Sequence, residues 1–73
     1  MRVIKIGPVP GGWSVQCGFG AEPALFTSGM RAEQAGRMLA QSLASVGQTV
    51  SLVIHDRYDR RAGIIHFGQR EAA

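Results

Sequence analysis

The sequence predicts an α+β domain in which a single sheet of about five strands is covered on one face by one helix. Five short runs alternate between apolar and polar residues, and one longer segment between the third and fourth runs has helical periodicity. At 73 residues the chain has room for one hydrophobic core. We therefore expect one domain over residues 1–73, with residues 69–73 as a disordered tail.

Residues 2–6 and 13–17 alternate between two faces, as half-buried strands do. Between them lies GPVPGG, residues 7–12, whose prolines lack an N–H and whose glycines permit positive φ. A phosphate-binding loop would need successive N–H groups in one concavity and a following helix. We expect the connection of an antiparallel pair instead. One face of the two strands collects the apolar side chains Ile4, Ile6, Trp13, Val15 and Cys17.

A turn signal at GFGAEP separates the second strand from a short third strand, ALFT, at residues 24–27. From Ser28 or Gly29 to Val46 the apolar residues recur at spacings of three and four, which predicts an amphipathic helix. Ser28 is the candidate N-cap, and Gly47 is placed to end the helix. Gly36 in its middle indicates either a close approach to another part of the chain or an unconstrained surface position.

Two strands are predicted after the helix, at residues 49–56 and 63–68. The polar segment RYDRRAG, which begins at Arg57, connects them. The predicted order is therefore strand, strand, strand, helix, strand, strand. A helix on one face of an antiparallel or mixed sheet is the simplest architecture for this order.

The motifs VPGGWSV, a Phe-Thr strand end before a helix with AEQA, and VIHDR followed by GIIHFG cover most of the chain. In these motifs the chain resembles a family of small bacterial and phage proteins known only as a domain of unknown function. Two positions depart from the family pattern. Met30 stands where the family has Thr or Ser three residues before the helix Glu, and the closing turn is longer. The resemblance implies the fold and carries over no activity.

The composition excludes several classes of protein. The single cysteine, Cys17, cannot form an intramolecular disulfide, and no tract resembles a signal peptide or spans a bilayer. We expect a soluble protein of the reducing cytoplasm. The net charge of +3 is small, but four of the seven arginines fall in residues 57–70. The basic character therefore gathers toward the C-terminal end.

Trp13 follows the first turn and alternates with Val15 and Cys17, which favours a structural anchor in the core over an exposed platform for stacking bases. The GFG at residues 18–20 is also found in RNA-recognition strands. The full motif needs a basic residue before the first glycine, and Cys17 stands there. The GFG is therefore not evidence for RNA binding.

Metal or acid–base chemistry would have to use a small set of side chains. If the last two strands are neighbours, the two histidines of the chain, His55 and His66, point away from the helix and could be diagonal partners about 7 Å apart. Two histidines do not complete a zinc site, a thiol in line with Trp13 is typical of a buried position, and no second carboxylate is placed for general acid–base work. We expect no catalysis, no metal, no other cofactor and no small-molecule substrate. The set considered is Cys17, His55, Asp56, Asp59 and His66.

The turn RYDRRAG offers a contact surface, since it combines phosphate-binding arginines with an aromatic ring. A hairpin tip kept soluble by its charge is the alternative. If the turn binds nucleic acid, the residues in contact are Arg57, Tyr58, Arg60 and Arg61.

The face of the sheet that the helix leaves uncovered is nearly half apolar, so we expect a second protein surface to cover it. The leading hypothesis is a non-enzymatic module that associates through this face, as a homodimer or with another protein. A nucleic-acid-binding module is the alternative. The apolar residues expected at the interface are Val3, Leu25, Val53 and Ile64.

Overall fold

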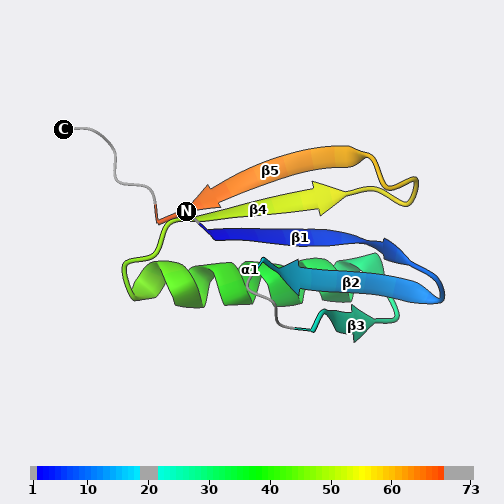
Figure 1. The fold of residues 1–73 in the computed structure, drawn as a ribbon, viewed down its shortest axis with the longest axis horizontal. Helices are drawn as coiled ribbons and strands as arrows, with labels where there is room; N and C mark the ends of the chain where they lie inside the picture. Colours follow the sequence, from blue (N-terminus) through cyan, green and yellow to red (C-terminus); the bar gives the residue numbers. More distant parts are fainter. Residues whose placement is uncertain (1, 19–21, 69–73) are drawn as a thin grey trace.

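The computed structural model describes residues 2–18 and 22–68. They form β1 (Arg2–Val9), β2 (Gly12–Cys17), β3 (Ala24–Phe26), α1 (Gly29–Ser45), β4 (Val50–His55) and β5 (Arg61–Phe67). The five strands make one sheet in the order β3-β2-β1-β4-β5, and α1 lies against one side of it (Figure 1). This architecture confirms the predicted α+β class and element order. The tail predicted at residues 69–73 lies outside the described residues.

The sheet is mixed, and β1 is its central strand. β1 pairs antiparallel with β2 and parallel with β4, while β4 and β5 form an antiparallel hairpin. Two parallel strands need a long crossover connection, and here β2, β3 and α1 together provide it. The first strand of the chain therefore lies beside a strand that follows the helix, in the middle of the sheet.

The first turn is shorter than the sequence predicted. β1 runs to Val9 and β2 begins at Gly12, so only Pro10 and Gly11 connect them. A proline followed by a glycine of positive φ, here 82°, is typical of a type II turn. Pro8 is accommodated inside β1 because the pairing with β4 ends at Ile6, where no further N–H is required on that side.

Both ends of α1 have the predicted caps. Ser28 is extended, with φ −135° and ψ 151°, and its side chain accepts a hydrogen bond from the N–H of Arg31 at 3.2 Å. At the other end Gly47 has a φ of 90°. Its N–H donates to the carbonyl of Ala44 at 3.0 Å, and the N–H of Gln48 donates to that of Leu43 at 3.1 Å. These two bonds form a Schellman motif.

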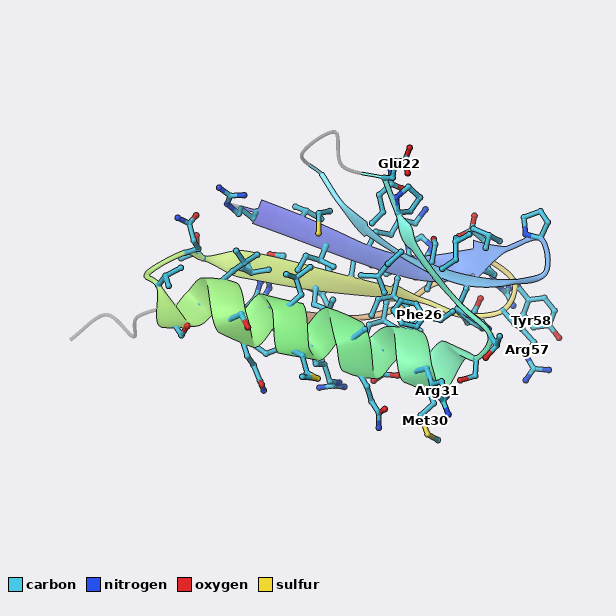
Figure 2. All side chains as sticks on the ribbon, turned by 90° about the horizontal axis from the view of Figure 1, so that it is seen from below. Glu22, Phe26, Met30, Arg31, Arg57 and Tyr58 are labelled. Atoms are coloured by element: carbon cyan, nitrogen blue, oxygen red, sulfur yellow. The ribbon has the colours of Figure 1, made fainter. Side chains whose placement is uncertain are left out.

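The core lies between α1 and the sheet, as Figure 2 shows from below. Its fully buried members come from the central strands and from one stripe of the helix. The stripe consists of small residues spaced by four, Ala32, Gly36 and Ala40, which are all buried. The sheet contributes Ile4, Ile6, Val15, Val50 and Leu52.

Gly36 lies where the helix approaches the sheet most closely. A Cβ atom on this residue would lie 2.7 Å from Cδ1 of Ile6 and 3.2 Å from Cδ1 of Leu52. The side chains of Ile6 and Leu52 are fully buried and have little room to move. Of the two interpretations that the sequence left open, the structure therefore supports the close approach.

Trp13 lies on the helix side of the sheet, partly buried, and packs against the core cluster. It is opposite Phe26 on β3, and its ring faces the start of α1. A Cβ atom on Gly29 would lie 3.1 Å from Cε2 of this ring. The first helical residue thus leaves space for the indole.

We expect Gly36→Ala to lower the free energy of unfolding by about 1–2 kcal/mol. The gain of about 1 kcal/mol in helix propensity is smaller than the cost of overpacking a filled core. Urea denaturation followed by circular dichroism measures the change. Ser42→Ala, on the exposed side of the same helix, is the control and should stabilise by a few tenths of a kcal/mol. A stabilised Gly36→Ala variant would contradict the close packing.

Trp13→Ala should lower the free energy of unfolding by about 2–3 kcal/mol, less than the 3–5 kcal/mol of a fully buried aromatic residue. The reason is that the indole is only partly buried. Thermal melting followed by circular dichroism provides the measurement, with the exposed Gln16→Ala of the same strand as the control. A Trp13→Ala variant that melts with the wild type would show that Trp13 is not an anchor.

Candidate functional site

The face of the sheet opposite α1 is the open face, and it has no covering layer within the described residues. Residues directly opposite on neighbouring strands share a face, so the register defines its members. They alternate with the core residues along each strand, as the sequence predicted. They are Val3, Lys5, Gly7, Ser14, Gln16, Leu25, Ser51, Val53, His55, Ile64 and His66.

Three of the four predicted interface residues lie together on the open face. Val53 is directly opposite Ile64 on β5, and Val3 on β1 is diagonal to Val53. The side chains of Val3 and Ile64 remain 46% and 40% exposed, and Val53 is partly buried between them. We call Val3, Val53 and Ile64 the apolar cluster.

Leu25 does not join the apolar cluster. It lies on β3 at the other edge of the sheet, 71% exposed, opposite Ser14. Ser14 and Gly7, which separate it from the β4 side, are small and buried. The apolar character of the open face is therefore divided, and its contiguous part lies over β1, β4 and β5.

The prediction that His55 and His66 lie about 7 Å apart is wrong. His66 is opposite Ser51, and His55 follows Ser51 by four residues on β4. At about 3.3 Å per residue this separates the two histidines by about 13 Å along the strand. The sequence did not reveal the register of the hairpin, which sets this distance.

Each histidine instead has its own local partners. Nδ1 of His66 lies 3.0 Å from Oγ of the buried Ser51. Nδ1 of His55 lies 3.0 Å from Oδ1 and 3.1 Å from the carbonyl oxygen of Asp59. Because both of these oxygens are acceptors, the Nδ1 of His55 carries the proton and donates it. Oδ1 of Asp59 also lies 3.8 Å from Nζ of Lys5.

Asp56 organises the turn between β4 and β5. Its Oδ1 accepts the N–H of Tyr58 at 2.8 Å and the N–H of Arg60 at 3.0 Å. The backbone closes around it, since the N–H of Asp59 donates to the carbonyl of Asp56 at 2.9 Å. The N–H of Arg60 holds the pKa of this carboxyl below its usual value; the N–H of Tyr58 and the charges of Arg60 and His55 also lower it, and desolvation opposes them.

Asp59 adopts a left-handed backbone with φ 59°, and no other non-glycine residue of the described chain has positive φ. A three-residue hairpin loop commonly has a glycine at this position, after a type I turn. Aspartate costs more there than glycine does. In return its carboxylate reaches His55 and Lys5 on the open face. The sequence pattern does not predict this contact, because the contact depends on the geometry of the turn.

The four residues predicted to bind nucleic acid lie at or beside this turn. Arg57, Tyr58 and Arg60 belong to it, whereas Arg61 is the first residue of β5. All four are exposed. The guanidinium carbon of Arg60 lies 5.3 Å from the centroid of the Tyr58 ring. The structure thus brings the four residues together at one end of the hairpin.

Cys17 is partly buried and packs against the core cluster. Within residues 2–18 and 22–68 no group of three or more His, Cys, Asp or Glu side chains is placed to hold a metal ion. The same residues enclose no pocket. α1, the helix among them, is not long and apolar enough to cross a membrane. The candidate sites are therefore the open face and the hairpin turn.

Comparison of the chain with protein-family models, with curated proteins and with solved structures finds no significant match. Its function has to be inferred from these two surfaces.

Protonation of Asp56 should weaken the fold. Its pKa in the folded state is lowered from the ordinary 3.8. Its carboxylate therefore stabilises the protein above that value, and this contribution is lost as the pH falls through the lowered pKa. Asp56→Asn keeps an acceptor oxygen but no charge. We expect the wild type to be more stable than Asp56→Asn at about pH 7 and the difference to shrink toward about pH 2. Urea denaturation across this range is the measurement, and a constant difference would contradict it.

Proposed function

We propose that the protein is a non-enzymatic module that self-associates, as a homodimer, through the β1, β4 and β5 half of its open face. The observation that carries the proposal is the contiguity of Val3, Val53 and Ile64 on a face that no other part of the described residues covers. Burying such side chains is favourable by about 25 cal/mol per Å² of apolar area. The chain's own helix covers only the other face.

A second copy fits this surface for two reasons. The charges beside the apolar cluster neutralise each other, because Lys5 is paired with Asp59 within each chain. Two identical faces therefore approach without strong repulsion. The apolar cluster also lies on the longer strands, which include the eight-residue β1 and the seven-residue β5, whereas Leu25 stands on the three-residue β3. This half of the open face therefore offers a second copy the larger surface to bury.

The size of the cluster sets the expected strength. A stable dimer buries about 800 Å² on each partner, and smaller interfaces are weak or transient. Three partly exposed aliphatic side chains supply only part of such an area. We therefore expect a dissociation constant in the range of about 1–100 μM.

The setting that we propose is the reducing cytoplasm, where a single partly buried cysteine such as Cys17 remains a thiol. The resemblance to the small bacterial and phage family also remains part of the proposal. It is supported by the motifs of the sequence and adds no activity.

Sedimentation velocity at about 1–100 μM tests self-association. We expect the wild type to shift from monomer to dimer over this range. Ile64→Lys, at an edge position where a lysine is tolerated in the monomer, should stay monomeric. Ile64 is preferred to Val53, because Val53 is the register neighbour of Lys5. A second charge there would repel within one chain.

Leu25→Lys is the matched control, since it also replaces an exposed aliphatic side chain of the same face by a lysine, but outside the apolar cluster and opposite Ser14. It should dimerise like the wild type. A wild type that is monomeric at every concentration, or an equal loss in both lysine variants, would refute the proposed interface.

A further inference from the structure

At the tip of the β4–β5 hairpin, residues 56–61, the acidic side chains bind groups of the protein itself, whereas the basic side chains are exposed to solvent. Oδ1 of Asp56 accepts the N–H groups of Tyr58 and Arg60. The carboxylate of Asp59 faces His55 and Lys5 on the sheet. The Asp56 carboxylate is therefore engaged with the backbone of the turn, and the Asp59 carboxylate, although its side chain is 60% exposed, is paired with side chains of the sheet.

The arginines of the tip point outward. Arg57 and Arg61 are exposed and form no ion pair with any described residue. The side chain of Arg60 is 75% exposed, with Nε 3.9 Å from Oδ2 of Asp56. Figure 2 shows Arg57 and Tyr58 projecting at one end of the molecule, with Arg31 toward the same end. The three arginines of residues 56–61 outnumber the two aspartates, so the net charge of the tip is positive.

Tyr58 adds an aromatic surface to this charge. It is 69% exposed. The guanidinium carbon of Arg60 lies over the ring, 5.3 Å from its centroid. A cation on one face of an aromatic ring orients the side chain and leaves the other face available. An unpaired base can stack on that face, and such stacking tolerates any base because every base has a π-face.

We propose that the tip binds single-stranded nucleic acid, with Arg57, Arg60 and Arg61 on the phosphates and a base stacked on Tyr58. A single strand fits because its base faces are free, whereas the bases of a duplex are stacked on one another. The turn is already ordered by Asp56, so binding orders little new backbone. The proposal does not depend on self-association.

Fluorescence anisotropy with a labelled single-stranded DNA of about 12 nucleotides and mixed sequence tests the proposal. At about 50 mM salt we expect a dissociation constant of about 10–100 μM. Two or three neutralised phosphates should give a slope of log affinity against log salt of about −1.4 to −2.1. Arg57→Gln should reduce the slope by about 0.7 and weaken binding about 5- to 10-fold.

Two controls separate the tip from general electrostatic attraction. Arg37→Gln removes the same charge from the middle of α1, where Arg37 is paired with Glu33 at 2.7 Å, and should bind like the wild type. Tyr58→Ala should weaken binding about 5- to 150-fold, while Tyr58→Phe should retain it. Circular dichroism checks that each variant is folded.

The proposal is overturned by absence of binding at low salt up to about 1 mM protein, a concentration above the usual non-specific range. Equal losses in Arg57→Gln and Arg37→Gln, or wild-type binding by Tyr58→Ala, would overturn it too. A duplex of the same sequence that binds more tightly than the single strand would show that stacking on Tyr58 is not the mode of recognition. Binding by the monomeric Ile64→Lys variant at wild-type affinity supports the tip as the site.

Discussion

The packing of one helix on one face of the sheet determines the rest of this structure. Contact is made through a stripe of small residues, Ala32, Gly36 and Ala40, so the helix approaches the buried Ile6 and Leu52 closely. Residues 2–18 and 22–68 contain one helix, of 17 residues, and it covers one face of the sheet in this way. The open face and the end of the long hairpin are the surfaces that remain for contact with other molecules.

The sequence predicted the fold well because local patterns encode it. Alternation placed Ile4 and Ile6 in the core, and the helix ended at the residues that Ser28 and Gly47 indicated. Turn lengths were less predictable. Pro8 was expected in the first connection, yet it belongs to β1, since pairing with β4 has ended before it. The residues around Pro8 do not indicate where the pairing between β1 and the distant strand β4 ends.

The candidate sites were only partly predictable for the same reason. Alternation assigned Val3, Val53 and Ile64 to one face, but only the strand order and register show that they are neighbours and that Leu25 stands apart. The distance between the two histidines depends on the hairpin register. The contact of Asp59 with His55 and Lys5 depends on a left-handed residue in the turn. Each of these features requires the relative placement of segments that are distant in sequence.

The parallel pairing of β1 with β4 gives the chain a particular order of assembly. β1 is synthesised first, yet one of its two neighbours lies beyond the helix, with Arg2 registered to Val50. Closing that long loop costs entropy before the central pairing stabilises anything, which slows folding. Until β4 has been synthesised and has paired, β1 has an unpaired edge on the side that faces β4 in the finished sheet. A growing or truncated chain that stops within α1 therefore exposes Ile4 and Ile6, which are fully buried in the complete sheet.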